Sequence, residues 1–227
     1  MKAIVLCGGL GTRLGKLTLN TPKPILPVAG RPFLEHVLNQ LVLMPIDQII
    51  LAVSFEWGKI RTLIGDSWCG IPVIYSIERQ PLGTGGAIKL AMTVTDCKEA
   101  LVINGDSLLK IDPNKLRFFA EKHQADVAIA LKPINDCSRY GIVSIDAANR
   151  IISFKDRGKL QSGLINCGVY YIRHAILGQI KEEKFSFESD FLAPMCERFL
   201  FYGMKTNAYF IDMGVPLDFA RSQIELS

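Results

Sequence analysis

Hydrophobic residues in the first half of the chain follow two alternating patterns. Short, nearly continuous apolar runs are typical of strands buried on both faces of a parallel sheet. They occur at residues 2–6, 48–53, 72–77 and 100–103. Stretches with apolar residues at helical spacing follow them, at residues 32–43, 57–64, 87–94 and 113–122. The alternation predicts a parallel sheet covered by helices on both faces.

The pattern changes after about residue 125, where strands follow one another directly. Four are predicted, at residues 126–132, 141–145, 150–155 and 164–172. A helix over 187–199, a strand over 209–211 and a last helix after Pro216 complete the chain. No linker, composition break or repeat interrupts it. We therefore predict one α/β domain over 1–227, a Rossmann-like three-layer sandwich with a mixed, mostly parallel central sheet, its second half inserted into the first.

Composition narrows the class of protein. The 227 residues are 49% apolar and 21% charged, as in ordinary globular domains, which excludes disordered and fibrous classes. No apolar run approaches the ~20 residues needed to cross a bilayer, and the N-terminal run is too short for a signal peptide. The sequence thus predicts a cytoplasmic protein that does not associate with membranes.

Charge and cysteine usage exclude further classes of protein. The net charge is +4, with no clustered basic run of the kind that nucleic-acid binding needs, so no nucleic-acid partner is expected. A few placed cations are enough for a small anionic substrate. The six scattered cysteines form no metal-binding or redox pair, and we expect them to be buried as small hydrophobes.

A glycine-rich segment, CGGLGTRLG at residues 7–15, follows the first predicted strand. Glycines let backbone N–H groups approach phosphate oxygens closely. A Walker loop is excluded, because Leu10 lies where its first glycine should be and Leu17 replaces its hydroxyl. A dinucleotide-binding fingerprint is excluded as well, because Leu14 takes the place of its third glycine.

The same loop, read as GGLGTRL and followed by Pro22-Lys23-Pro24, resembles the opening signature of the sugar-1-phosphate nucleotidyltransferases. Six further segments resemble that family in the same order, so that the resemblance covers essentially the whole chain. They are PLGTGGA (81–87), NGD (104–106), RYG (139–141), ISFK (152–155), GLIN (163–166) and YFIDMG (209–214). Within the family, LGTGGAI, ALKP, RYG, GLIN and FSFE are most similar to the D-glycero-α-D-manno-heptose 1-phosphate guanylyltransferases.

The resemblance implies an enzyme with a nucleotide-binding half at 1–124 and a sugar-binding half at 125–227. Larger relatives carry a C-terminal β-helix or acyltransferase domain; here the sequence runs to Ser227 directly after the last predicted helix, so no such domain is expected. The implied reaction is attack of a sugar 1-phosphate on the α-phosphorus of a nucleoside triphosphate, which releases pyrophosphate. The nucleotide sugar would serve the synthesis of a surface polysaccharide such as capsule or lipopolysaccharide.

Three residues are expected to carry the chemistry. Arg13 can hold the β- and γ-phosphates with its fork of donors, and Lys23 can place a point charge at the α-phosphate. Asp106 is the third, as a metal ligand. The attacking phosphate oxygen is already an anion, so no general base or covalent intermediate is required.

Asp106 and Asp212 are the expected ligands of Mg²⁺. Each follows an apolar run and is therefore expected at the carboxyl end of a strand, the edge of an open α/β sheet where ligands bind. Two carboxylates suit a hard cation that completes its octahedron with phosphate oxygens and water.

The resemblance places the nucleotide on residues of the first half. They are Leu6, Gly8, Gly9, Gly11, Thr12, Arg13, Glu78, Pro81, Gly83, Thr84 and Asp106. Glu78 aligns where uridylyl-transferring relatives have a glutamine. Guanine presents two adjacent donors that a carboxylate accepts as a pair, whereas uracil would set a carbonyl oxygen against it. We therefore expect GTP as the nucleotide donor.

The sugar phosphate is expected on Lys23 and on residues of the second half. These are Tyr140, Gly141, Lys155, Asp156, Arg157 and Asn166. At Asp156 and Arg157 relatives usually have a glutamate and a lysine, so either Arg157 or Lys155 is expected to hold the sugar phosphate. Asn166 lies in an apolar strand, where a buried amide without a partner would be costly.

Other interpretations stay open at this point. The sugar could be mannose 1-phosphate, or the chain could be a uridylyl- or thymidylyltransferase of the same family. A non-catalytic regulatory protein that binds the same sugar nucleotides is a further alternative, although such proteins are expected to lose a metal carboxylate or the loop arginine. The oligomeric state, homo-oligomer included, is not determined by the sequence.

Overall fold

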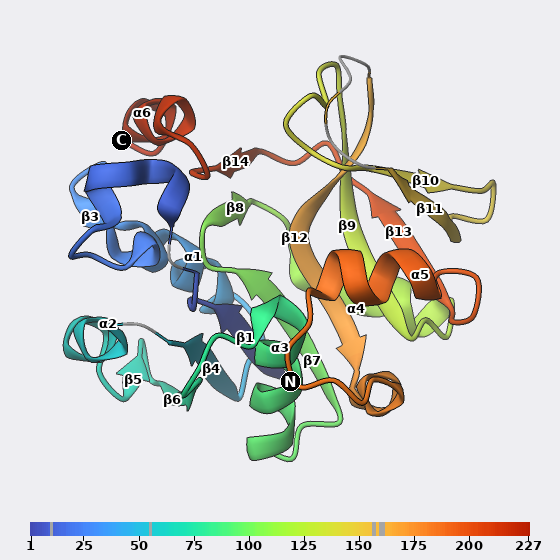
Figure 1. Cartoon of the computed structure of the whole chain (residues 1–227), viewed down its shortest axis with the longest axis horizontal. Helices are drawn as coiled ribbons and strands as arrows, with labels where there is room; N and C mark the ends of the chain where they lie inside the picture. Colours follow the sequence, from blue (N-terminus) through green and yellow to red (C-terminus); the bar gives the residue numbers. More distant parts are fainter. Residues whose placement is uncertain (10, 55, 156–157, 159–161) are drawn as a thin grey trace.

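The structure is a computed structural model that describes residues 1–9, 11–54, 56–155, 158 and 162–227, with only the backbone of Thr12. The described residues form one ten-stranded sheet (Figure 1). Its strands are β1 (Lys2–Leu6), β4 (Gln48–Val53), β5 (Ser67–Trp68), β6 (Ile71–Ile77), β7 (Glu99–Asn104), β9 (Val127–Ile134), β10 (Ile142–Ile145), β11 (Ile151–Lys155), β12 (Gly163–Arg173) and β13 (Phe201–Lys205).

The strand order is β11-β10-β12-β7-β1-β4-β6-β5, with β9 beside β12 and β13 beside β9. The central strands β7, β1, β4 and β6 run parallel to their neighbours in this group, whereas β12 joins β7 in antiparallel pairing. Parallel strands end at one edge of the sheet, so the loops after β1, β6 and β7 meet there. The sheet is continuous through both halves of the chain.

Two short ladders and the helices complete the fold. The ladders pair β2 (Pro27–Val28) with β3 (Arg31–Pro32), and β8 (Ser107–Leu109) with β14 (Phe210–Asp212). The α-helices are α1 (Phe33–Leu41), α2 (Trp57–Ile64), α3 (Gly83–Val94), α4 (Pro113–Lys122), α5 (Ala193–Met195) and α6 (Pro216–Glu225). The described part of the chain also contains three 3₁₀ segments, η1 (Thr12–Thr18), η2 (Lys23–Ile25) and η3 (His174–Gln179), and one π-helix, η4 (Phe187–Leu192).

Successive strand residues point into two different cores, which makes the fold three-layered. In β1, Ala3 and Val5 pack with buried residues of α1, α2 and α4, whereas Ile4 packs with α3, η3 and η4 on the other face. All three side chains are fully buried. The predicted three-layer α/β architecture is therefore confirmed, and the site-forming loops project from its centre.

The structure differs from the predicted elements in two helices and in several short strands. Helix α3 begins at Gly83 rather than at residue 87, because Gly83, Gly85 and Gly86 let its first turn lie against the Phe185 segment without side-chain overlap. The helix expected over 187–199 is a π-helical turn that gives way to three α-helical residues and ends at Met195. The strands β2, β3, β5, β8 and β13 were not predicted.

Two further expectations can be compared with the structure. Five of the six cysteines are buried as predicted, whereas Cys69 is exposed in the turn between β5 and β6, where its φ of 47° is left-handed. Among the described residues, no helix is long and apolar enough to cross a membrane.

Candidate active site

Two adjoining cavities lie at the edge of the sheet where the central strands end. The first, of about 530 Å³, is bordered by the loops after β1, β6 and β7, and by the start of α3. The second, of about 350 Å³, lies on the side of β12 and β14. Arg13, Asn104 and Asp106 line both. Ligands in the two cavities would therefore meet at these three side chains.

The first cavity gathers the residues that the sequence assigned to the nucleotide. Those lining it are Leu6, Gly8, Gly9, Gly11, Arg13, Glu78, Pro81, Gly83, Thr84 and Asp106, together with Lys23. The side chain of Thr12 lies outside the described residues. Pro24, Ala87 and Asn104 also line it and were not predicted. Asn104, the last residue of β7, could have been inferred from the NGD segment that contains Asp106.

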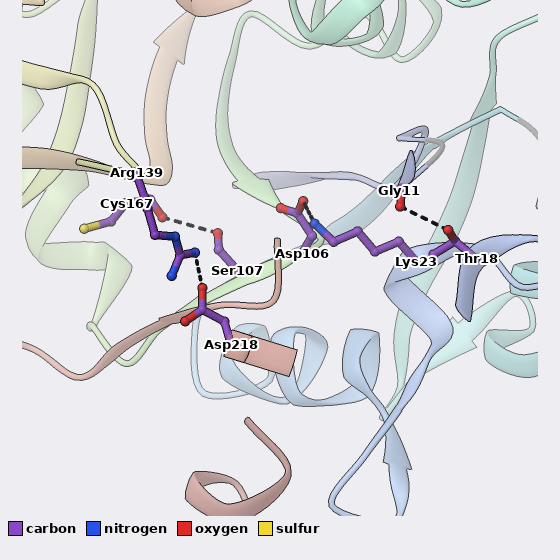
Figure 2. Close-up of polar contacts among 8 residues, drawn as sticks. All are labelled: Gly11, Thr18, Lys23, Asp106, Ser107, Arg139, Cys167 and Asp218. Carbon is purple, nitrogen blue, oxygen red and sulfur yellow. Dashed lines mark hydrogen bonds and ion pairs between the residues drawn. The ribbon is translucent and has the colours of Figure 1, made fainter. Parts of the chain in front are cut away.

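The glycine loop is shaped by Gly11, whose φ of 64° is left-handed. A Cβ there would come within 2.8 Å of the Thr18 methyl group and 3.0 Å of Lys23 Cβ. The Thr18 hydroxyl donates to the Gly11 carbonyl at 3.0 Å (Figure 2). The loop thus packs directly on Lys23 and presents Arg13, the second residue after Gly11, to both cavities.

Lys23 and Asp106 form an ion pair across the site (Figure 2). The Lys23 side chain is only 6% exposed, whereas that of Asp106 is 37% exposed. Lys23 lies between two prolines at the start of η2, and Asp106 follows the end of β7. The buried ammonium is held against the carboxylate, so this pair is preorganised before any ligand binds.

The two predicted metal ligands are brought together by the ladder between β8 and β14. Its register places Asp212 opposite Ser107, the residue after Asp106. The Met213 N–H also donates to the Asp106 carbonyl at 3.1 Å. Burial and the Asp106 carboxylate raise the pKa of Asp212, while Lys23 acts to lower it. Both carboxylates line the second cavity, where a cation would relieve their mutual repulsion.

Glu78 follows β6 and reaches the wall of the first cavity between two backbone segments. Its Oε2 accepts from the Leu82 N–H at 2.9 Å. A Cβ on Gly8 would lie only 2.7 Å from Glu78 Oε1, so glycine at position 8 leaves room for the carboxylate. Burial raises the pKa of Glu78, and the Leu82 hydrogen bond opposes the shift. Each carboxylate oxygen can accept a further hydrogen bond.

The second cavity contains some of the residues predicted for the sugar. Tyr140, Gly141 and Asn166 line it. Lys155 does not line it, and its side chain is exposed. Its backbone carbonyl oxygen packs against Gly141, where an added Cβ would lie only 3.1 Å from it. Asp156 and Arg157 lie outside the described residues, so their predicted roles stay predictions.

A polar network at the far wall of this cavity was only partly predicted. The Asn166 amide donates to the Tyr170 hydroxyl at 2.8 Å and to Glu188 Oε1 at 3.2 Å. Its Oδ1 accepts from the Gly168 N–H at 3.0 Å. Tyr170 and Glu188 also line the cavity. Glu188 ends the FSFE segment, which carried the family resemblance but suggested no role.

Gly168 forms the bulge that bends β12 around this site. Its φ is 72°, the pairing of β12 with β9 is interrupted there, and a Cβ would overlap the Asn104 side chain. We expect Gly168→Ala to lower the free energy of unfolding by about 1–3 kcal/mol, since both strain and overlap oppose it. Urea unfolding would measure this. Gly178→Ala, in open space in η3, is the matched control; an equal loss in both variants would contradict the argument.

Comparison with known proteins agrees with this geometry. The family model "Nucleotidyl transferase" matches residues 2–223. The chain is 44% identical to the D-glycero-alpha-D-manno-heptose 1-phosphate guanylyltransferase of Aneurinibacillus thermoaerophilus, with 100% of this chain and 98% of the relative covered. It is 41% identical to the enzyme of the same name from Campylobacter jejuni, covering 96% of this chain and 97% of the relative.

A solved structure has the same fold over the whole chain. It is the crystal structure of HddC from Yersinia pseudotuberculosis complexed with GMP-PN, with a TM-score of 0.86 and 34% sequence identity. The match covers 100% of this chain and 99% of that one. The family model spans nearly all of the sequence, and the relatives are matched over almost their full length. This chain belongs to the nucleotidyl transferase family.

Proposed function

We propose that this protein transfers GMP from GTP to a sugar 1-phosphate, D-glycero-α-D-manno-heptose 1-phosphate, and releases pyrophosphate. The observation that carries the proposal is the pair of adjoining cavities that share Arg13 and Asp106. A nucleotide in the first and a sugar phosphate in the second would bring their phosphates together at these residues. The names of the relatives support both the nucleotide and the sugar.

The reaction joins two anions, so the site must offset their repulsion and align them. Arg13 lies where it can hold the β- and γ-phosphates, and the buried Lys23 ammonium can face the α-phosphate. The sugar-phosphate oxygen then attacks the α-phosphorus as pyrophosphate leaves on the opposite side. No proton must be removed from the nucleophile, which agrees with a site built from cations and carboxylates.

We propose Mg²⁺ as the cofactor, held by Asp106 and Asp212. The pair fits such an ion, because the two carboxylates line one cavity, where burial and, after it, the Asp106 carboxylate raise the pKa of Asp212. Among the described residues no cluster of three or more metal-ligating side chains occurs, and Mg²⁺ usually takes only one or two protein carboxylates together with phosphates. When bound, it would neutralise charge on the α-phosphate.

Glu78 is the residue we expect to select guanine. Its carboxylate can accept from N1–H and the 2-amino group, whereas the amide of Glu78→Gln can pair with both the donor and an acceptor of uracil. We expect Glu78→Gln to lower the ratio of kcat/KM for GTP to that for UTP by about ten- to a hundredfold. Steady-state assays with both nucleotides measure this ratio. Equal ratios in the wild type and the variant would refute the role of Glu78.

The raised pKa of Glu78 gives a second test of the same contact. Guanine pairs with the ionised carboxylate, so KM for GTP should rise as the pH falls through this raised pKa. Glu78→Gln has no proton to gain at this position, so its KM should rise less steeply than that of the wild type, with only the phosphates of GTP left to titrate. A wild-type KM for GTP that stays constant over this range, or a variant with the same slope, would show that Glu78 does not contact the base.

The distinction from a purely binding, regulatory protein rests on the catalytic set, since Arg13, Lys23, Asp106 and Asp212 are all present at the cavities. Pyrophosphate release tests it: we expect release that requires GTP, heptose 1-phosphate and Mg²⁺ together. Tight binding of both substrates without release would favour the regulatory alternative.

We also propose that the GDP-sugar is made in the cytoplasm for surface polysaccharide synthesis.

A further inference from the structure

Arg139 is a cation of the second cavity to which the sequence assigned no role. It lies in the segment between β9 and β10 and precedes Tyr140 and Gly141. Its side chain is 38% exposed and its Cζ lies 5.5 Å from the centroid of the Tyr140 ring. A partly exposed guanidinium at the wall of a cavity can still reach a ligand.

Asp218 in the first turn of α6 holds this guanidinium in place. Nη2 of Arg139 donates to Asp218 Oδ2, and the Asp218 side chain is only 5% exposed (Figure 2). Helix α6 is itself fixed by Gln223, which donates to the Pro27 carbonyl at 2.7 Å and accepts from the Ala29 N–H at 2.9 Å. The helix that carries Asp218 is therefore held in place independently of Arg139.

The charges that line the second cavity indicate that a bound phosphate would need Arg139 as a partner. Among the described residues, the side chains lining it that carry charge at neutral pH are three carboxylates and two guanidinium groups, namely Asp106, Asp212, Glu188, Arg13 and Arg139. A sugar 1-phosphate adds roughly −1.5 to −2 in charge at neutral pH. Without cationic partners, this phosphate would be repelled by the carboxylates.

Of the two cations, Arg13 also lines the first cavity, where the triphosphate is expected. Arg139 lines the second cavity and not the first. One of its five N–H donors is committed to Asp218, which leaves donors for phosphate oxygens. The pair with Asp218 also fixes a long side chain in place, so less rotamer freedom is lost when a ligand binds.

We propose that Arg139 binds the phosphate of the sugar 1-phosphate and that Asp218 is its positioning residue. The inference rests on the proposed function and adds a binding residue to it. Arg139 contributes donors from the second cavity alone, whereas Arg13 contributes them where the two cavities meet. Asp218 acts through Arg139 and does not contact the ligand.

The test is equilibrium binding of D-glycero-α-D-manno-heptose 1-phosphate by calorimetry, with GTP binding measured alongside. We expect Arg139→Gln to weaken sugar-phosphate binding by about ten- to a hundredfold and to change GTP binding by less than about twofold. The sugar-phosphate affinity of Arg139→Lys should lie between those of the wild type and Arg139→Gln. Asp218→Asn should weaken sugar-phosphate binding several-fold, and adding it to Arg139→Gln should cause little further loss.

Arg221→Gln is the matched control. Arg221 also approaches Asp218, at 3.8 Å, but does not line the cavity, so its loss should leave both affinities unchanged. Since Arg139→Gln alone leaves the buried Asp218 without this partner, the double variant Arg139→Gln/Asp218→Asn serves if the single variant does not fold. Unchanged sugar-phosphate binding, an equal loss of GTP binding, or the same loss in Arg221→Gln would overturn the proposal.

The proposed function fails in a different way. It fails if the wild-type protein binds GTP and heptose 1-phosphate but releases no pyrophosphate, whatever Arg139→Gln does to binding. The inference about Arg139 fails if the wild type releases pyrophosphate and the folded variant binds the sugar phosphate as tightly as the wild type does.

Discussion

Asp106→Asn is expected to slow nucleotidyl transfer by about 10²–10³-fold in a protein that still folds. Asp106 lines both cavities, pairs with Lys23 and lies beside Asp212 in the β8–β14 ladder. The amide keeps the size of the side chain but removes the negative charge that would hold Mg²⁺ and orient Lys23. Pyrophosphate release at saturating Mg²⁺ measures the loss.

Stability must be followed separately in this variant. The buried Lys23 ammonium loses its charged partner, and we expect the free energy of unfolding to fall by about 1–3 kcal/mol. Asp66→Asn, at an exposed ion pair with Arg61, is a matched control that should affect neither activity nor stability by much. Turnover of Asp106→Asn at the wild-type rate would show that Asp106 is not part of the catalytic machinery.

Arg13→Ala is expected to lower kcat/KM for GTP by about 10²–10³-fold, the second large effect. Its guanidinium is presented by the glycine loop to both cavities, where triphosphate and sugar phosphate would meet. The guanidinium can bind phosphate oxygens with two parallel hydrogen bonds, whereas a lysine ammonium is a point charge. Arg13→Lys should therefore retain only part of the wild-type kcat/KM. Steady-state kinetics with varied GTP measure both variants.

The control for Arg13 lies in the same 3₁₀ segment. Lys16 is exposed and lines neither cavity, so Lys16→Ala should keep kcat/KM within about twofold. If Arg13→Ala and Lys16→Ala had equal effects, general electrostatic attraction of GTP would explain the loss, and the specific contact with the β- and γ-phosphates would be refuted.

The fold could be predicted from periodicity where burial alone determines an element. The strand Gln48–Val53 and the helix Trp57–Ile64 have the bounds that their apolar patterns predicted. Helix α3 starts earlier than predicted because a glycine-rich first turn looks like a loop in sequence, although its contact with Phe185 requires the absence of Cβ atoms. Strand β13, FYGMK, is short and mixed, and only its pairing with β9 reveals it.

The site divides in a similar way. The nucleotide side was predicted from the family resemblance. The structure brings its residues together because the segments after β1, β6 and β7 meet at one edge of the sheet. The sugar side depends on the β12 bulge at Gly168 and on the arrival of Glu188 from a distant segment. Neither follows from residue spacing. Arg139 was missed because its significance depends on Asp218, 79 positions further along the chain.

The most direct test of the proposed function is kcat/KM for the four nucleoside triphosphates and dTTP, each paired with heptose, mannose and glucose 1-phosphates, with the products identified. We predict that GTP with D-glycero-α-D-manno-heptose 1-phosphate gives the highest value and yields a GDP-sugar and pyrophosphate in equal amounts. Preference for UTP or dTTP with any of these sugars, or the absence of a nucleotide sugar in every combination, would contradict the proposed function.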